Sequence, residues 1–297
     1  MYKRQLYNNK INPANPLKVA DNPIGEWNTF RIKIIGDKVT VFLNGELVVN
    51  KVQLENYWDR SIPLFPKESI ELQAHGTDLA FRDIYVEELN NSEYTVPAEE
   101  AKEGFKPLFN GLNFDGWTGN LIDYHVDNGE IVLHLDNGPT HGNIFTVGEY
   151  SDFVVRFEFQ LTPAANNGLG IRAPLVGDAA YSGMEIQVLD SEDPVYSDLA
   201  PYQYHGSVYG VIPAKRGYLK PIGQWNYEEV TAKGNRIKVT LNGTVILDGD
   251  IKEASKNGTL DHREHPGLLN PKGHIGFLGH GSVVKFKNIR LKELSKK

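Results

Sequence analysis

The chain has 297 residues, no cysteine and a formal net charge of −7 at pH 7, with a pI near 5.7. The absence of cysteine excludes disulfides and thiolate metal sites, and dispersed Lys and Arg in an acidic chain argue against a nucleic-acid partner. No apolar run approaches the roughly 20 residues of a membrane span. The apolar runs are short and rich in Val, Ile, Phe and Tyr between Gly-containing turns, which predicts an all-β protein.

The N-terminal part of the sequence predicts a loop followed by strands. It opens with MYKRQ, which translation of a common sequencing-adapter tail from a GTG start would give, so we expect the natural N-terminus, with any signal peptide, to be missing. Residues 6–25 are polar and contain several prolines, which predicts an extended loop. Alternating apolar residues then predict strands at 29–36, 38–49, 69–76 and 79–89, with Asn44-Gly45 as a hairpin turn.

The composition divides the chain in two. Residues 90–104 lose the alternation and become acidic and polar, as in a linker. We therefore predict a first unit at 1–89 and a complete domain at 105–297. In the second unit we expect strands at 131–135, 153–161, 167–173, 183–189 and 206–211.

An internal repeat links the two parts. Residues 25–45 align without a gap with 223–243, pairing Trp27 with Trp225, and residues 74–89 align with 279–294, pairing His75 with His280. The first copy has no counterpart of residues 105–190, so we expect 1–89 to be the C-terminal half of a sandwich, with an exposed sheet face. Because Trp27 and Trp225 recur in both copies, we expect them, like Trp117, to pack in a core.

The stretch from Asn166 to Asp190 organises the complete domain. In its second run Met184, Ile186 and Val188 should face one side and Glu185 and Gln187 the other. If its two runs pair, Arg172 can lie on the polar face with Glu185. A bulge after Gln187 would bring Asp190 onto the same face.

Several segments in a fixed order resemble the 3-keto-disaccharide hydrolase family. They are FKPLFNGLNFDGW, ANNGLGIR, MEIQVLD, GSVYG, GQWN, LNG and GHGSVVKFKNIRLKEL. The resemblance implies a concanavalin A-like jelly-roll sandwich of two antiparallel sheets and cleavage of glycosides already oxidised at C3, by hydrolysis or by elimination and hydration. Two residues depart from the family pattern: Asn167 replaces a usual Ser, and Gly279 replaces a frequent Asp.

The resemblance directs attention to an acid and its neighbours. Glu185 on a rigid strand facing a groove suits a proton-transfer carboxylate. Asp190 is a second catalytic candidate, although a turn-capping role is equally expected. His280 is the third candidate, since imidazole carries protons near neutral pH, while a turn His is often only structural. Candidate substrate-binding residues are Arg172, Gln187, Tyr209, His205 and Tyr181. Arg172 is also open to a purely structural ion pair with Glu185.

Partners and cofactors follow from the same residues. We expect an oligosaccharide or glycoside substrate, and a glycan-degrading role would suit the periplasm or exterior. The alternative is a non-catalytic carbohydrate-binding module, because lectin-like sandwiches bind sugars without cutting them. No metal ligand is assigned; Ca²⁺ is a secondary expectation at the acidic loop of Asp190, Glu192, Asp193 and Asp198.

Overall fold

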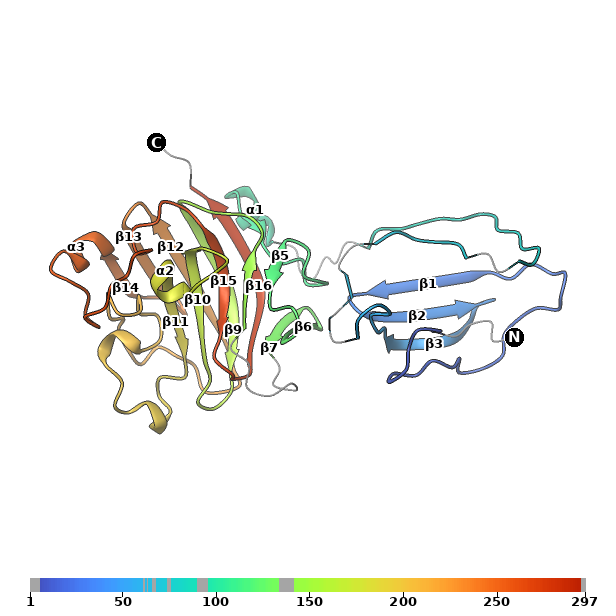
Figure 1. Cartoon of the computed structure of the whole chain (residues 1–297), viewed down its shortest axis with the longest axis horizontal. Coiled ribbons are helices and arrows are strands. Elements are labelled where there is room, and N and C mark those ends of the chain that lie inside the picture. The colour runs from blue at the N-terminus through green and yellow to red at the C-terminus, as the bar shows by residue number, and fades with distance from the viewer. Residues whose placement is uncertain are drawn as a thin grey trace. The chain divides into compact units, whose positions relative to one another are not determined.

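The computed structural model describes residues 6–60, 62, 64–65, 68–73, 76–89, 96–133 and 142–294. It separates into two compact units, Met1–Glu93 and Tyr94–Lys297 (Figure 1). Each unit is described by itself. In the described part of the chain, no helix is long and apolar enough to cross a membrane.

The N-terminal unit is built on a three-stranded antiparallel sheet of β1 (Phe30–Ile35), β2 (Lys38–Leu43) and β3 (Glu46–Gln53). Asn44 and Gly45 join β2 to β3 with φ values of 51° and 84°, as expected of a two-residue hairpin turn. The apolar residues of β2 and β3 form a small core under the N-terminal segment, where Leu6 and Ala20 pack against it. That core consists of Val39, Val41, Leu43, Val48 and Val49.

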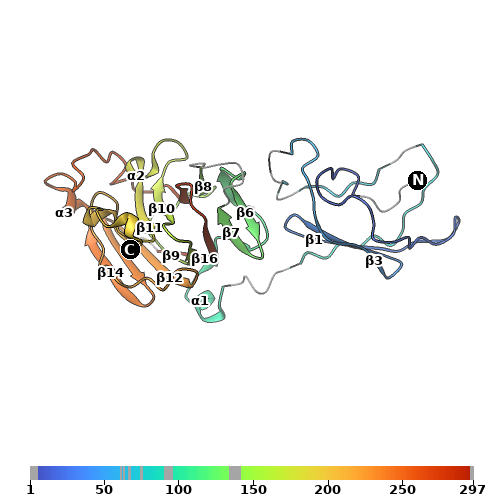
Figure 2. The ribbon, with the colours of Figure 1, turned by 90° about the horizontal axis from the view of Figure 1, so that it is seen from below.

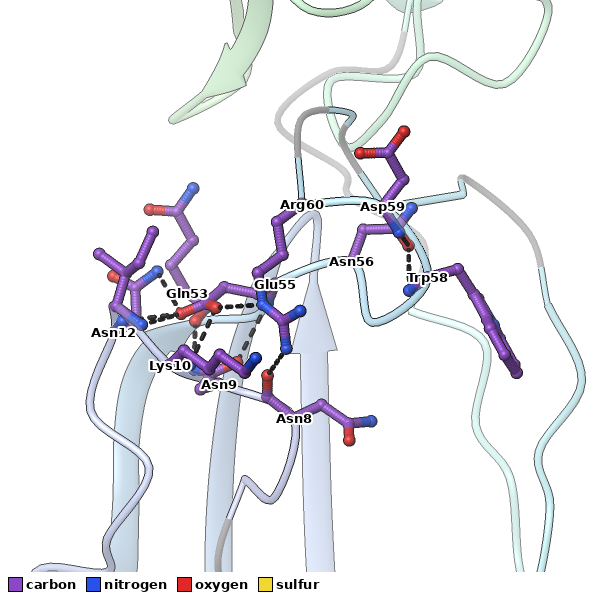
Figure 3. A network of polar contacts seen from close by, with 11 residues as sticks. Asn8, Asn9, Lys10, Asn12, Gln53, Glu55, Asn56, Trp58, Asp59 and Arg60 are labelled. Carbon is purple, nitrogen blue, oxygen red and sulfur yellow. Dashed lines mark hydrogen bonds and ion pairs between the residues drawn. The ribbon is translucent and has the colours of Figure 1, made fainter.

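A polar network ties the N-terminal segment to the end of the sheet (Figure 3). The Glu55 carboxylate accepts hydrogen bonds from the backbone N–H groups of Lys10, Ile11 and Asn12 at 2.7–2.9 Å and from Arg60 Nε at 3.2 Å. These bonds, with Asn12 first, lower the pKa of Glu55 to about 2 against the opposing effect of burial. The segment before β1 is therefore fixed rather than a free loop.

Two strands predicted for this unit do not form. The described residues of 69–76, and all of 79–89, belong to no strand and form no backbone ladder with another described residue. His75, expected to match His280, lies outside the described residues. Their alternating sequence suits a strand, but a strand needs a paired neighbour, and β1 pairs only with β2 among the described strands.

The C-terminal unit is an antiparallel sandwich of two sheets, seen in Figure 2 with β10 and β11 in one layer and β12 and β14 in the other. The all-β, two-sheet prediction is confirmed. The five-stranded sheet has the order β11 (Met184–Leu189), β10 (Asn166–Ala173), β15 (His274–Gly279), β8 (Asn143–Thr146) and β5 (Trp117–Gly119). The larger sheet runs β14 (Thr244–Asp250), β13 (Arg236–Leu241), β12 (Trp225–Lys233), β9 (Phe153–Leu161), β16 (Val284–Glu293), β7 (Glu130–Leu133) and β6 (Tyr124–Asp127), with β4 (Lys106–Pro107) on β16.

Strict alternation places the core between these sheets. Along β9 every second residue from Phe153 to Leu161 is buried, as period-two patterning requires. Trp117 is buried and stacks on Phe277, with ring centroids 5.8 Å apart, which confirms its predicted packing role. Phe277 in turn stacks on Phe286 of the opposite sheet at 3.7 Å. The sheet carrying β10 and β11 is thereby held rigidly against its partner.

Other sequence predictions need correction. Residues 98–102, inside the predicted linker, form helix α1 (Ala98–Lys102), and its Glu100 is bound by both Arg290 and Arg156 of the sandwich. Residues 206–211 make isolated bridges, including Ile186 to Val208, rather than a strand. Trp27 and Trp225 are not core residues: Trp27 is 49% exposed, and Lys287 Nζ lies 3.8 Å above the Trp225 ring. Each ring instead lies under a cation, since Arg82 is 4.0 Å from the Trp27 ring.

Candidate functional site

The pairing of β10 with β11 places Glu185 on the outer face of the five-stranded sheet. Glu185 lies opposite Gly170, and Gln187 lies opposite Gly168. Met184, Ile186 and Val188 point into the core, so the odd-numbered residues of β11 point the other way. The predicted division of this strand into a core face and a polar face is therefore present.

Glycine on the neighbouring strand gives the carboxylate its position. A Cβ at Gly168 would lie 2.0 Å from Glu185 Oε1, so the side chain occupies space that any other residue would fill. Glu185 and Gln187 are only 4% and 5% exposed. Their Oε1 atoms are buried without a hydrogen-bond partner among the described residues. Two such acceptors, two residues apart on one face, are uncommon, because an unpaired buried acceptor is energetically costly.

His280, directly after β15, provides the nearest charge to Glu185. Its Nε2 lies 3.8 Å from Glu185 Oε1, an ion-pair distance longer than a hydrogen bond, and its side chain is 42% exposed. The interaction with Glu185 raises the pKa of His280 above its usual value, against the effect of burial, and Asp178 raises it further. The structure thus brings together two of the three predicted catalytic candidates.

Tyrosines extend the site beyond β11. Tyr209 donates its backbone N–H to the Glu185 carbonyl at 2.9 Å, so the two residues are cross-strand neighbours and their side chains share a face. The Tyr209 ring lies edge-on to Tyr181 at 6.4 Å and to Tyr202 at 6.1 Å. Two predicted sugar-binding residues, Tyr209 and Tyr181, therefore lie beside Glu185, and Tyr202 joins them.

Sequence reasoning missed a second group of polar residues at this edge. Arg263 Nη1 donates a hydrogen bond of 3.0 Å to the Tyr181 hydroxyl, and His265 packs on the Tyr181 ring at 4.7 Å. His265 Nε2 also lies 3.0 Å from Asp261 Oδ2. Burial opposes ionisation of Asp261, but bonds from His265 and from the Arg263 backbone outweigh it and lower the pKa. The signal was the run DHREH at 261–265, where ionisable residues gather in a loop.

Arg172 does not lie beside Glu185, and that prediction is wrong. The ladder between β10 and β15 shifts register between Gly170 and Ala173, and Arg172 has φ 49°. Its guanidinium donates to the carbonyls of Ser151 and Gly234, both at 2.8 Å, and to Asp152 Oδ1 at 3.1 Å. Arg172 thus forms a structural ion pair, but its partner is Asp152 and not Glu185, the partner that the sequence suggested.

Asp190 does not join the row of Glu185 and Gln187. The register of β11 is regular through Leu189, so the expected bulge is absent and Asp190 falls beyond the strand. Its Oδ2 accepts the backbone N–H of Ala164 at 3.0 Å, so Asp190 fixes the loop before β10 and does not cap residues 191–198, the role that was the alternative. Neighbouring acids have similar uses, Asp193 accepting from Val195 N at 2.9 Å, and the described residues contain no group of three His, Asp or Glu suited to a metal ion.

His205 lies inside the sandwich rather than on the sugar-binding face, contrary to expectation. Its Nε2 is 3.0 Å from Glu228 Oε2, and both side chains are almost fully buried, at 3% and 0% exposed. Its Nδ1 accepts the backbone N–H of Leu189 at 3.3 Å, which places the ring proton of neutral His205 on Nε2, towards Glu228. This pair supports the end of β11 from the core side.

The two departures from the family pattern are neighbours in space. Asn167 on β10 and Gly279 on β15 are paired Cα partners. A Cβ at Gly279 would lie 2.5 Å from the Gly142 carbonyl oxygen, while Asn167 Nδ2 donates to the Tyr124 hydroxyl at 3.2 Å. Asn167, which is larger than the usual Ser, thus lies opposite Gly279, which is smaller than the frequent Asp. The ladder between β10 and β11, beside Glu185, is continuous.

Fold and face together define an antiparallel sandwich protein with ionisable and aromatic side chains gathered on one sheet. A family model described as the 3-keto-alpha-glucoside-1,2-lyase-like domain matches residues 4–87 and 104–292. The chain belongs to this family.

Individual relatives agree with that assignment. A 3-keto-disaccharide hydrolase from Bacteroides thetaiotaomicron is 24% identical over 229 residues, covering 65% of this chain and 79% of the relative. Crystal structures of two putative glycosyl hydrolases from Parabacteroides distasonis are 25% and 27% identical, with TM-scores of 0.60 and 0.57. They cover 68% and 64% of this chain and 99% of their own chains.

Proposed function

We propose that this protein cleaves glycosides whose sugar carries a ketone at C3, and that Glu185 and His280 are its reacting groups. Family membership supports a carbohydrate substrate. The observation that carries the proposal is the pair of buried, unpaired acceptors, Glu185 Oε1 and Gln187 Oε1, beside His280 and Tyr209. Both atoms have almost no accessible surface, so a sugar hydroxyl group would donate to them only after neighbouring side chains move aside.

A ketone at C3 makes the hydrogen on C2 acidic, and a carboxylate next to it can remove that proton. In the proposed step Glu185 takes the C2 proton, a C1=C2 double bond forms, and the bond from C1 to the leaving oxygen breaks. Water then adds a hydroxyl to C1 and a hydrogen to C2, so the net reaction is hydrolysis. Direct displacement by Glu185 and Asp190 has less support, because Asp190 is engaged with the Ala164 backbone.

His280 has the charge that this route needs. Since Glu185 raises the pKa of His280, the imidazolium form persists to higher pH than in an ordinary histidine. A cationic donor next to the substrate can stabilise the enolate oxygen as it develops or give a proton to the leaving oxygen. The Tyr181, Tyr202 and Tyr209 rings would contact the apolar face of the sugar.

The test is product release from a 3-keto glucoside by the full chain and by Glu185→Gln. We expect the substitution to lower the rate by about 10²–10⁴-fold, because the carboxylate base is lost while size and packing are retained. Incorporation of solvent deuterium at C2 of the product would identify elimination and hydration. Glu158→Gln, on the opposite sheet, is the matched control and should retain the wild-type rate.

Different outcomes separate the alternatives. Unchanged cleavage in folded Glu185→Gln would refute the assigned base, and cleavage without deuterium at C2 would refute elimination. No cleavage by the wild type, with binding of the 3-keto glucoside that Tyr209→Leu abolishes, would instead support the non-catalytic binding module. Repeating the assay with a chelator tests the Ca²⁺ expectation directly.

We also propose that residues 22–89 are the C-terminal half of a second family domain. The support is a set of side-chain bonds that recur at a constant offset. Asn44 Nδ2 donates to Asn28 Oδ1 and to the Ala20 carbonyl, both at 2.8 Å. Asn242 Nδ2 donates to Asn226 Oδ1 at 2.9 Å and to the Tyr218 carbonyl at 2.8 Å.

The second repeated segment supports the same proposal. Arg82 lies 4.0 Å over the Trp27 ring, as Lys287 lies 3.8 Å over Trp225. The following residues, Asp83 and Asn288, have φ values of 52° and 51°. A left-handed residue at the same aligned position is a specific backbone feature rather than a shared composition.

A further inference from the structure

A loop at residues 259–270 is anchored on two sides beside the tyrosines of the candidate site. On one side, the Leu260 backbone N–H donates to the Gly210 carbonyl at 2.8 Å. On the other side, the Gly267 backbone N–H donates to the Tyr181 carbonyl at 2.9 Å. The loop therefore connects the two segments that carry these tyrosines and has a fixed path between them.

The contact with Gly210 buries a carboxylate–imidazole pair of the loop. A Cβ at Gly210 would lie 2.6 Å from Asp261 Oδ2 and 2.8 Å from His265 Nε2. The side chains of His265 and Asp261 are only 2% and 6% exposed. This pair therefore supports the loop from below and leaves no surface for a ligand.

Arg263 is the residue that this support presents to solvent. Its backbone N–H donates to Asp261 Oδ1 at 3.1 Å, and its carbonyl accepts the Thr259 hydroxyl at 2.7 Å. The preceding residue, His262, has φ 57°, a left-handed conformation that turns the chain sharply. The backbone of Arg263 is thus fixed, while the residue itself is exposed.

The guanidinium of Arg263 is oriented by Tyr181. Its Nη1 donates to the Tyr181 hydroxyl at 3.0 Å, and its central carbon lies 5.8 Å from the Tyr181 ring centroid. Its Nε and Nη2 have no hydrogen-bond partner among the described residues. These two nitrogens form the edge of a guanidinium that binds a carboxylate through two parallel hydrogen bonds.

The nearby acids do not occupy this edge. Glu185 lies 3.8 Å from His280 Nε2, and the cationic form of His280 offsets its charge. Asp261 is bonded to His265 and to the backbone N–H of Arg263 rather than to its guanidinium. Arg263 therefore provides an exposed cation that neither acid contacts directly through its guanidinium.

A continuous set of contacts connects the reacting pair to this cation. Tyr209 is the cross-strand neighbour of Glu185, and its ring lies 6.4 Å from the Tyr181 ring. The Tyr181 hydroxyl in turn accepts from Arg263. A sugar bound on the Tyr209 ring thus has the cation one ring further along, at the position of a substituent rather than of the reacting carbons.

We propose that Arg263 is a specificity-determining residue, which binds a carboxylate of the glycoside through Nε and Nη2. The carboxylate belongs either to the leaving group or to C6 of the reacting sugar. The inference rests on the proposed function, because the sugar must bind beside Glu185. It concerns binding rather than cleavage, so the two can fail separately.

The test compares matched pairs of 3-keto glucosides by calorimetric titration of the full chain carrying Glu185→Gln, and by KM in the wild type. One pair is the 4-carboxyphenyl and the neutral 4-carbamoylphenyl 3-keto-α-glucoside. The other is methyl 3-keto-α-glucuronide and methyl 3-keto-α-glucoside. The acidic member of a pair should bind about fivefold more tightly, the upper range for an exposed ion pair, and the pair that shows this preference locates the carboxylate.

Variants separate recognition from structural support. Arg263→Gln should bind the acidic and neutral probes equally, whereas a purely structural arginine would weaken both and keep their ratio. Arg263→Lys retains the charge without the two-donor edge and should keep part of the preference. Arg236→Gln, at an exposed arginine bonded to Asp248 on the larger sheet, is the matched control and should keep the wild-type ratio.

Two results would overturn the inference. One is equal binding of the acidic and neutral members in both pairs, and the other is a preference that Arg263→Gln retains. A wild type that cleaves all probes with equal KM would contradict this inference and leave the cleavage proposal standing. A preference that depends on Arg263, in a wild type that cleaves no probe, would support the inference and contradict cleavage.

Discussion

Two histidine–carboxylate pairs lie on opposite sides of β11. They differ mainly in their access to water. Glu185 and His280 lie on the outer face, 3.8 Å apart, with His280 42% exposed. Glu228 and His205 lie in the core, 3.0 Å apart, with neither more than 3% exposed. The same two residue types can thus provide a reactive pair or an internal support.

The comparison teaches that surroundings decide the role. His205 is fixed by the Leu189 backbone, the Phe159 ring at 5.1 Å and Glu228, so it has no room for a ligand. Buried oxygens without a hydrogen-bond partner occur in both Glu185 and Glu228, so the difference is that solvent or substrate can reach His280. The inner pair should govern stability and the outer pair should govern activity.

The largest expected effect on stability is on the inner pair. Glu228→Ala leaves the buried His205 ring without its polar neighbour, and we expect the free energy of unfolding to fall by about 1–3 kcal/mol, as for other buried polar groups left without a partner. Denaturant unfolding would measure it. Glu192→Gln, at an exposed acid in the loop after β11, is the control, with a change within about 0.5 kcal/mol. If Glu228→Ala changed stability as little as this control, the inner pair would have no supporting role.

Replacing the outer histidine should affect the rate instead. His280→Gln removes the cation beside Glu185 and should lower the turnover of a 3-keto glucoside by about 10²–10³-fold, as the loss of a donor to a developing oxyanion does. A circular dichroism melt should show the wild-type transition. A full rate in this variant would leave Glu185 as the only active member of the pair.

The pH dependence sharpens the same contrast. Interaction with Glu185, opposed by burial, raises the pKa of His280 above 6.5. The stabilising interaction is therefore complete below that value and is lost as the pH rises through the raised pKa of the folded protein. NMR titration of the His280 ring protons should show a lower midpoint in Glu185→Gln, and an unchanged midpoint would mean that the two groups are not coupled.

The smallest effect should come from Asp190, which the sequence placed with Glu185. Asp190→Ala removes one hydrogen bond to the Ala164 backbone, so we expect unfolding to become easier by about 0.5–1.5 kcal/mol with little change in turnover. Equilibrium unfolding and the glucoside assay, run together, would separate the two. A rate loss as large as that of Glu185→Gln would return Asp190 to the reacting groups.

Alternation along a strand is a local property, so it predicted the strands and the two faces of β11, whereas the two-sheet sandwich followed from the family resemblance. The sequence could not predict the position of Arg172, because a register shift between Gly170 and Ala173 redirects the side chain. Nor could it separate His205 from His280, since burial depends on what packs from the other sheet. Arg263 and His265 reach the site through a long loop whose path no local pattern encodes.

The hairpin turns and residues 79–89 show the same difference between local and non-local determinants of structure. Asn44-Gly45 forms the predicted hairpin turn, and Asn242-Gly243 has similar φ values, because the turn chemistry is contained in two residues. Residues 79–89 carry an equally clear strand pattern but form no ladder with a described residue. An alternating pattern indicates that a segment can form a strand. Whether it does so depends on a neighbouring strand, which the rest of the fold must provide.

Gly168 has a consequence for how this site can be lost in evolution. Since a methyl group at this position would occupy the place of Glu185 Oε1, the acid can be displaced without changing any residue that we propose to contact the sugar. A sequence could therefore keep the glutamate, the histidine and the tyrosines and still be inactive through one added carbon. A search for active members of the family should therefore require both the glycine and the acid.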